Sequence, residues 1–221
     1  MIFSVNGFNK ELNFNEIDVA ELTIENPEMY FNITNDIIFQ ANGGNGEYCS
    51  LREAEIDNLF QTKAEIIHNY YELTLNSKKI LNYVQKEILK LGSSQDFIID
   101  INNINCVLSN LTEKIEESID IPIVFDNTYT LSDIVKFVKF SVYESDKLNE
   151  RLIEYIELIS RLCSVNLIVL FNPNFILSRE NLKTIINQSK YYGVKLLIVN
   201  SKMANIAVDD NIIIDKDLCE I

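Results

Sequence analysis

The sequence predicts an α/β protein with a mostly parallel sheet and an inserted helical segment. Near the C-terminus, two apolar runs, 166–171 and 195–200, flank an amphipathic stretch over 178–192. This arrangement is typical of a strand–helix–strand unit whose strands are buried on both faces. Near the N-terminus, residues 10–14 and 19–24 alternate between apolar and polar side chains, as half-buried strands do. The sheet is therefore expected to receive strands from both ends of the chain.

One helix is clearly signalled in the N-terminal part. Asn26 is a typical capping residue, Pro27 suits the first helical turn, and the acid Glu28 suits the positive end of the helix dipole. We expect this helix to end at the glycine-rich turn 42–46.

The pattern from residue 50 to residue 92 is mostly helical but interrupted, and 66–75 fits a helix or a strand equally well. A clean helix is predicted over 78–91, begun by the capping pair Asn76-Ser77 and ended by Gly92. The remaining expected elements are a helix over 100–119, a loop over 120–130, a helix over 131–137, a strand over 139–143, a helix over 146–163 and a last strand at 212–214.

These elements predict two domains. An α/β head would comprise residues 1–74 and 149–221, and a helical leg would comprise residues 75–148.

The overall charge gives an ambiguous indication of partners. The chain has 33 acidic and 19 basic residues, a formal net charge of −14. Such a balance argues against a nucleic-acid-binding protein, unless a local basic strip meets the phosphates. The longest apolar run, 167–171, is too short to cross a bilayer, and the first residues lack the pattern of a signal peptide. We therefore expect a cytoplasmic protein without membrane contact.

No catalytic motif is found in the sequence. The phosphate-binding pattern GxxxxGK[ST] is absent, and the glycines of 43–46 are followed by Glu47 rather than by a lysine. There is no GxSxG motif, the four cysteines form no CxxC pair, and no spacing singles out two carboxylates among the many acids. We expect no enzymatic activity, no catalytic residue and no nucleotide-binding residue.

Lysines form one of two notable groups of charged residues. Lys79, Lys86 and Lys90 share one face of the helix predicted over 78–91. Three ammonium groups along about three turns could follow a phosphate backbone, although an ordinary solvated helix face has the same pattern. Lys136 and Lys139 form a second, smaller basic pair.

Acidic residues form the other group, around the end of one helix and the loop that follows. Its members are Glu113, Glu116, Glu117, Asp120 and Asp126. Carboxylates at a helix C-terminus oppose the helix dipole, and a hard cation such as Ca²⁺ would relieve that conflict. The spacing is not that of an EF-hand, so an acidic surface without a metal is the other interpretation.

Several segments together resemble a known family. The apolar run and loop over 167–178, the segment 194–200 and the segment 209–217 resemble the C-terminal head of the second Csn family, the small adaptation proteins of type II-A CRISPR loci. Leu75-Asn76-Ser77 before a lysine-bearing helix, and Ile119-Asp120-Ile121 in the acidic stretch, extend the resemblance over nearly the whole chain. The likeness is one of pattern and element order, since this family has no diagnostic catalytic signature.

The resemblance implies an architecture and a function. Members of this family have a head related to P-loop ATPases without a working nucleotide site, and a helical leg inserted in it. Four subunits form a ring whose lysine-lined channel takes double-stranded DNA by its ends, and Ca²⁺ ions organise the leg. The protein acts in spacer acquisition, an antiviral defence, with the CRISPR integrase and the RNA-guided nuclease of the locus.

The resemblance also shifts the interpretation of both groups. It implies that Lys79, Lys86 and Lys90 bind DNA, and that Asp120 and Asp126 bind Ca²⁺. We add the second basic pair, Lys136 and Lys139, to the expected DNA contacts, and Glu117 to the expected Ca²⁺ ligands because it lies near them in sequence. Two alternatives stay open from the residues themselves. One is a degenerate ATPase-like scaffold that binds only proteins, and the other is a metal-dependent nuclease that uses the acidic group.

Overall fold

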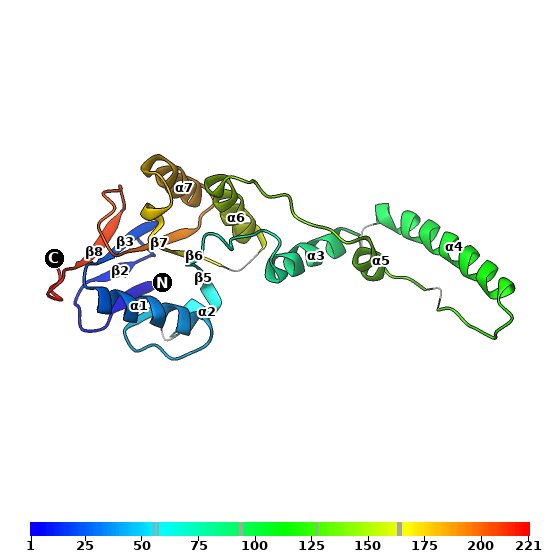
Figure 1. Ribbon diagram of the computed structural model, residues 1–221, viewed down its shortest axis with the longest axis horizontal. Helices are drawn as coiled ribbons and strands as arrows, with labels where there is room; N and C mark the ends of the chain where they lie inside the picture. The colour runs from blue at the N-terminus through cyan, green and yellow to red at the C-terminus, as the bar shows by residue number, and fades with distance from the viewer. Residues whose placement is uncertain (55, 57, 93–94, 127, 163–164) are drawn as a thin grey trace. The chain divides into compact units, whose positions relative to one another are not determined.

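The computed structural model (Figure 1) describes residues 1–54, 56, 58–92, 95–126, 128–162 and 165–221. The chain divides into two compact units, which are Met1–Leu75 with Glu144–Ile221, called the head below, and Asn76–Tyr143, called the leg. The sequence places the second boundary after residue 148, whereas 144–148 belong to the head. The Glu144 carboxylate accepts hydrogen bonds from the Thr74 hydroxyl at 2.9 Å and the Leu75 N–H at 2.7 Å. These bonds join the two segments of the head at which the chain leaves for the leg and returns from it.

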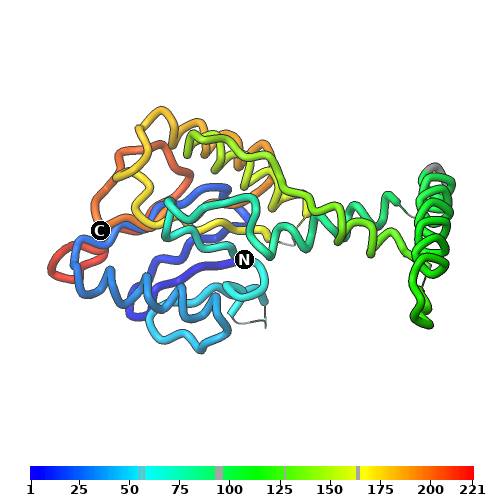
Figure 2. Tube along the Cα trace, turned by 45° about the vertical axis from the view of Figure 1, so that its right-hand side comes forward, coloured from blue at the N-terminus to red at the C-terminus, as the bar shows by residue number. Residues whose placement is uncertain are grey.

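A five-stranded parallel sheet forms the centre of the head, in the order β5-β6-β7-β3-β8. Its strands are β3 Val19–Ile24, β5 Ala64–Ile67, β6 Leu167–Phe171, β7 Lys195–Asn200 and β8 Asp210–Ile214. The predicted α/β class and the crossover from β6 through α7 (Arg179–Tyr191) to β7 are confirmed. Figure 2 shows the early strands, in blue and cyan, lying among the late ones, in yellow and orange. Strands from both ends of the chain thus share one sheet.

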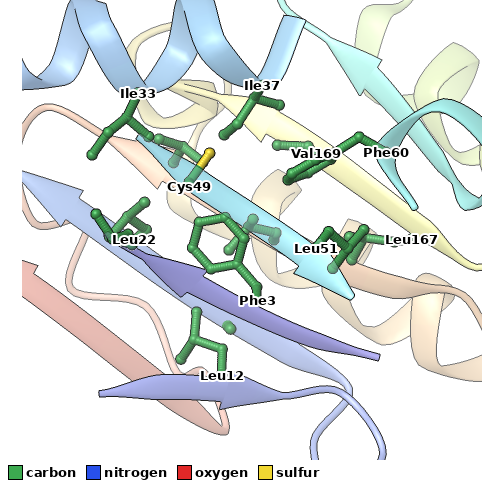
Figure 3. Close-up of a cluster of buried hydrophobic side chains, with 14 of the residues drawn as sticks. Phe3, Leu12, Leu22, Ile33, Ile37, Cys49, Leu51, Phe60, Leu167 and Val169 are labelled. Atoms are coloured by element: carbon green, nitrogen blue, oxygen red, sulfur yellow. The ribbon is translucent and has the colours of Figure 1, made fainter. Parts of the chain in front are cut away.

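A second, antiparallel sheet and helix α1 (Pro27–Ala41) cover one face of the parallel sheet. The second sheet has the order β2-β1-β4, with strands β1 Ile2–Val5, β2 Glu11–Asn13 and β4 Cys49–Arg52. Figure 3 shows the core between these layers, where Phe3 and Leu51 meet Ile37 and Val169. The short helix α2 (Phe60–Lys63) leads into β5 and adds the buried ring of Phe60.

Helices α6 (Leu148–Leu162) and α7 cover the other face, above the sheet in Figure 1. Their buried residues recur at helical spacing, as in Leu152, Ile156 and Ile159 of α6. Both faces of the sheet are therefore covered. For this reason β3, predicted to be a half-buried strand from its alternation, is buried at every position, including the polar residues Glu21 and Thr23.

Two strands lie where the sequence predicts mostly helix. β4 overlaps the start of the interrupted 50–92 pattern, where the helical prediction is wrong, whereas β5 overlaps the stretch 66–75, which fits a helix or a strand equally well. Strands this short carry little periodic signal, and their partners β1 and β6 are distant in sequence. Pairing across the sheet decides their conformation.

The leg contains α3 (Lys78–Gly92), α4 (Gln95–Ser118) and α5 (Leu131–Val138). The expected strand over 139–143 is wrong. The Asn76 side chain takes the place of a strand partner there, because its Oδ1 accepts from the Val142 N–H at 2.8 Å and its Nδ2 donates to the Val142 carbonyl at 2.9 Å. Among the described residues, no helix combines the length and the apolarity needed to cross a bilayer.

A buried carboxylate fixes the turn between α1 and β4. Asp36 accepts hydrogen bonds from the N–H groups of Glu47, Tyr48 and Cys49 at 2.8–3.1 Å, and from the Gln40 side chain at 3.0 Å. Burial, followed by the nearby Asp36 charge, raises the pKa of the Cys49 thiol well above its ordinary value. Cys49 is therefore a neutral packing residue.

Replacing this carboxylate is expected to destabilise the head. Asp36→Ala leaves several donors without an acceptor, which costs about 3 kcal/mol in the free energy of unfolding. Urea denaturation followed by circular dichroism measures the loss, and Glu25→Ala, at an exposed acid of the same unit, serves as the control. Equal stability of the two variants contradicts the role given to Asp36.

Candidate nucleic-acid interface

The predicted lysines of α3 lie on one exposed face of the helix. Ser77 begins α3, with its Oγ accepting the Ile80 N–H at 3.4 Å, and Ile80 is buried. Lys79, Lys86 and Lys90 are all exposed. We call these three residues the α3 lysine stripe. Their spacing places them within about 40° of one another around the helix and spreads them over about 16 Å of its length.

Neighbouring side chains shape the stripe without covering it. Tyr83 lies on the same face, and the Lys86 Nζ stands 5.3 Å from the centre of its ring, a cation–π contact. Lys90 forms an ion pair with Glu87, and its side chain is 70% exposed. Exposed pairs of this kind contribute little free energy, so a phosphate could replace Glu87 as the partner of Lys90.

Lys136 and Lys139 do not join this stripe. Both residues line a hollow of the leg with Leu81 and Gln85. Leu81 and Gln85 lie on the side of α3 roughly opposite to the lysine stripe. This is the side against which α5 packs. The five lysines predicted as one DNA-binding set therefore form two separate groups on different sides of α3.

The acidic segment after α4 runs back along that helix. The Phe125 N–H donates to Glu116 at 3.1 Å, and the Asn105 amide pairs with the backbone of Tyr129 at 3.0 and 3.3 Å. The Asp126 carboxylate accepts from the hydroxyl and the N–H of Thr128, at 2.6 and 3.2 Å, and these bonds lower its pKa below the ordinary range.

The predicted Ca²⁺ ligands are exposed rather than clustered. Glu117, Asp120 and Asp126 all face solvent. Within the described part of the chain, no three acidic, histidine or cysteine side chains gather closely enough to hold a metal ion.

The first parallel strand leads into its helix without room for a phosphate loop. β3 ends at Ile24 and α1 begins at Pro27, so only Glu25 and Asn26 connect them. The Asn26 Oδ1 accepts the Met29 N–H at 3.0 Å, and this side chain occupies the end of α1 where a phosphate would bind in a nucleotide site.

A buried polar network fills the same edge of the sheet. Glu21 accepts from the Asn200 side chain at 2.7 Å and from the Ala204 N–H at 3.0 Å. Asn172 donates to the Tyr30 hydroxyl at 2.7 Å, which lowers the pKa of Tyr30. Burial has the larger, opposite effect and raises that pKa to about 12. These groups are engaged in holding the strand ends together.

Comparison with known proteins gives no further guide to the chain. No protein-family model matches it, and a search of curated proteins finds no match.

Proposed function

We propose that this protein binds the ends of double-stranded DNA, independently of sequence, as a homotetrameric ring. The observation that carries the proposal is the α3 lysine stripe, three exposed cations aligned on one helix of an otherwise acidic protein. At 3.4 Å per base pair, its length of about 16 Å corresponds to about five steps along one strand. Lys79 and Lys86 are then about three steps apart and Lys86 and Lys90 about two, so the stripe could contact three phosphates along one strand.

The ring supplies what one chain lacks. A single subunit carries a formal charge of −14, which repels DNA at long range. Four copies of the α3 lysine stripe around one channel would give a local positive field, while the acidic surface stays outside. Self-association is supported by α4, which has an apolar face that the single chain covers only in part. This face, called the α4 stripe below, consists of Phe97, Ile101, Ile104, Leu108, Leu111 and Ile115.

Calcium dependence and the cellular role are proposed on the family resemblance. Calcium would bind through Glu117, Asp120 and Asp126, which requires these exposed carboxylates to come together. The protein would act without catalysis, in the cytoplasm, during spacer acquisition in type II-A CRISPR immunity. Its partners there would be the integrase and the RNA-guided nuclease of the same locus.

The test is a gel shift that compares one plasmid in closed-circular and linearised form, with Ca²⁺ and then with chelator. We expect binding to linear DNA only, because a ring can load from an end, and loss of binding on chelation. Failure to bind either form overturns the DNA role and favours a scaffold that binds only proteins. Shortening of the linear DNA in Mg²⁺ or Mn²⁺ would instead support the nuclease alternative.

A further inference from the structure

A phenylalanine of the leg is unusually exposed. Phe137, in the last turn of α5, is 88% exposed, and the adjacent Val138 is 67% exposed. Large rings are normally buried, because leaving one in water forgoes the free energy of its burial. The ring is therefore a candidate contact for a partner.

Both ends of the helix that carries this ring make local contacts. α5 begins with a capping box, in which Asp133 accepts from the N–H and hydroxyl of Thr130 at 3.1 and 2.5 Å. At the other end, Lys136, Lys139 and Phe140 line the hollow against α3. Phe137 lies between these lysines in sequence but is not among the residues that line the hollow.

The charge around Phe137 favours an anionic partner. From residue 128 to residue 143 the chain has two bases, Lys136 and Lys139, and one acid, Asp133. The Asp133 carboxylate accepts a hydrogen bond from the Thr130 N–H and lies 3.6 Å from the Lys136 Nζ. An exposed ring flanked by lysines is the combination that stacks on bases while contacting phosphates.

We propose that Phe137 stacks on the terminal base pair of a DNA duplex, with Lys136 and Lys139 contacting the phosphates beside that end. The inference rests on the proposed DNA binding and deepens it, since it names the group that recognises an end. A duplex exposes the flat face of a base pair only at its termini, whereas its sides present phosphates and groove edges. The α3 lysine stripe lies on another side of α3, so the end contact and the side contacts can be tested separately.

The chain contains no tryptophan, which makes a direct test simple. Phe137→Trp introduces a single indole, to be titrated with a blunt duplex and with the same duplex closed at both ends by hairpin loops. We expect strong quenching with the blunt duplex alone. Tyr143→Trp, at a residue of the leg that is 86% exposed, is the matched control and should respond to neither DNA. Equal responses of Phe137→Trp to both duplexes, or no response while a labelled duplex binds, overturn the proposal.

Two further variants measure the contribution of the ring. Phe137→Ala and Phe137→Leu should both bind the blunt duplex about tenfold more weakly, the scale of one base–aromatic stack, and bind the closed duplex as the wild type does. An unchanged preference for open ends overturns the role of Phe137 while leaving the proposed function standing. A changed molecular mass of either variant also overturns it, because the ring then belongs to a contact between subunits. Absence of DNA binding by the wild type would refute the proposed function itself.

Discussion

Reversing two charges of the α3 lysine stripe is expected to weaken DNA binding about 100-fold at 150 mM salt. Lys86→Glu combined with Lys90→Glu removes two cations per subunit and places two anions on the same exposed face, which repels the phosphates. Because each neutralised phosphate releases condensed counterions, the slope of log K against log salt should also fall, by about 0.9 for each phosphate that the variant no longer neutralises. Fluorescence anisotropy with a labelled duplex at several salt concentrations measures both effects.

A matched variant distinguishes the effect of this site on DNA binding from the effect of the changed net charge. Lys183→Glu combined with Lys202→Glu changes the formal charge equally but alters two exposed lysines of the head. We expect this control to bind within a few-fold of the wild type. Both double variants should keep the wild-type mass, since the substituted residues are exposed. Wild-type affinity of the Lys86 and Lys90 variant would refute the assignment of the stripe as the DNA contact.

The elements that sequence reasoning predicted well carry their signal locally. The runs that became β6 and β7 are apolar at nearly every position, and α7 between them has its own cap at Ser178. The strands β4 and β5 have four residues each and depend on distant partners. For such segments the local pattern does not distinguish a strand from a helical turn, and the tertiary partner determines the outcome.

The same distinction applies to the candidate site. The α3 lysine stripe was predictable, because spacings of four and seven residues fix a common face once the segment is helical. The separation of Lys136 and Lys139 from that stripe was not predictable, since it depends on the side of α3 against which α5 packs. The exposure of the predicted Ca²⁺ ligands was not predictable either. It depends on the course of the loop after α4, which is held by hydrogen bonds to Asn105 and Glu116. The exposure of Phe137 likewise depends on tertiary packing.

Helix α4 provides the most direct test of assembly. Its stripe repeats at alternating intervals of four and three residues, the heptad spacing of helices that pair along a seam. None of its members is buried, and Ile104 and Leu111 are 40% and 53% exposed. A stripe of six large apolar side chains over about 27 Å is more than single exposed residues on a surface. We therefore expect a second copy of the chain to cover it.

Introducing charge into this stripe should dissociate the ring without unfolding the chain. Ile104→Glu combined with Leu111→Glu places two carboxylates in a seam that must exclude water, whereas in the separate subunit both positions already contact solvent. Light scattering after size exclusion should give about 102 kDa for the wild type, four times 25.5 kDa, and a smaller mass for the variant.

The control for this prediction is Ile99→Glu, at a position 68% exposed on the opposite side of α4, which should keep the wild-type mass. The dissociated variant should also bind DNA more weakly although its α3 lysine stripe is intact, because one subunit alone lacks the avidity of four that bind the same duplex together. A tetramer that survives both substitutions would place the subunit contacts elsewhere. A wild type of 25.5 kDa at micromolar concentration would refute the ring itself, and the α3 lysine stripe would then have to bind DNA as a single helix face.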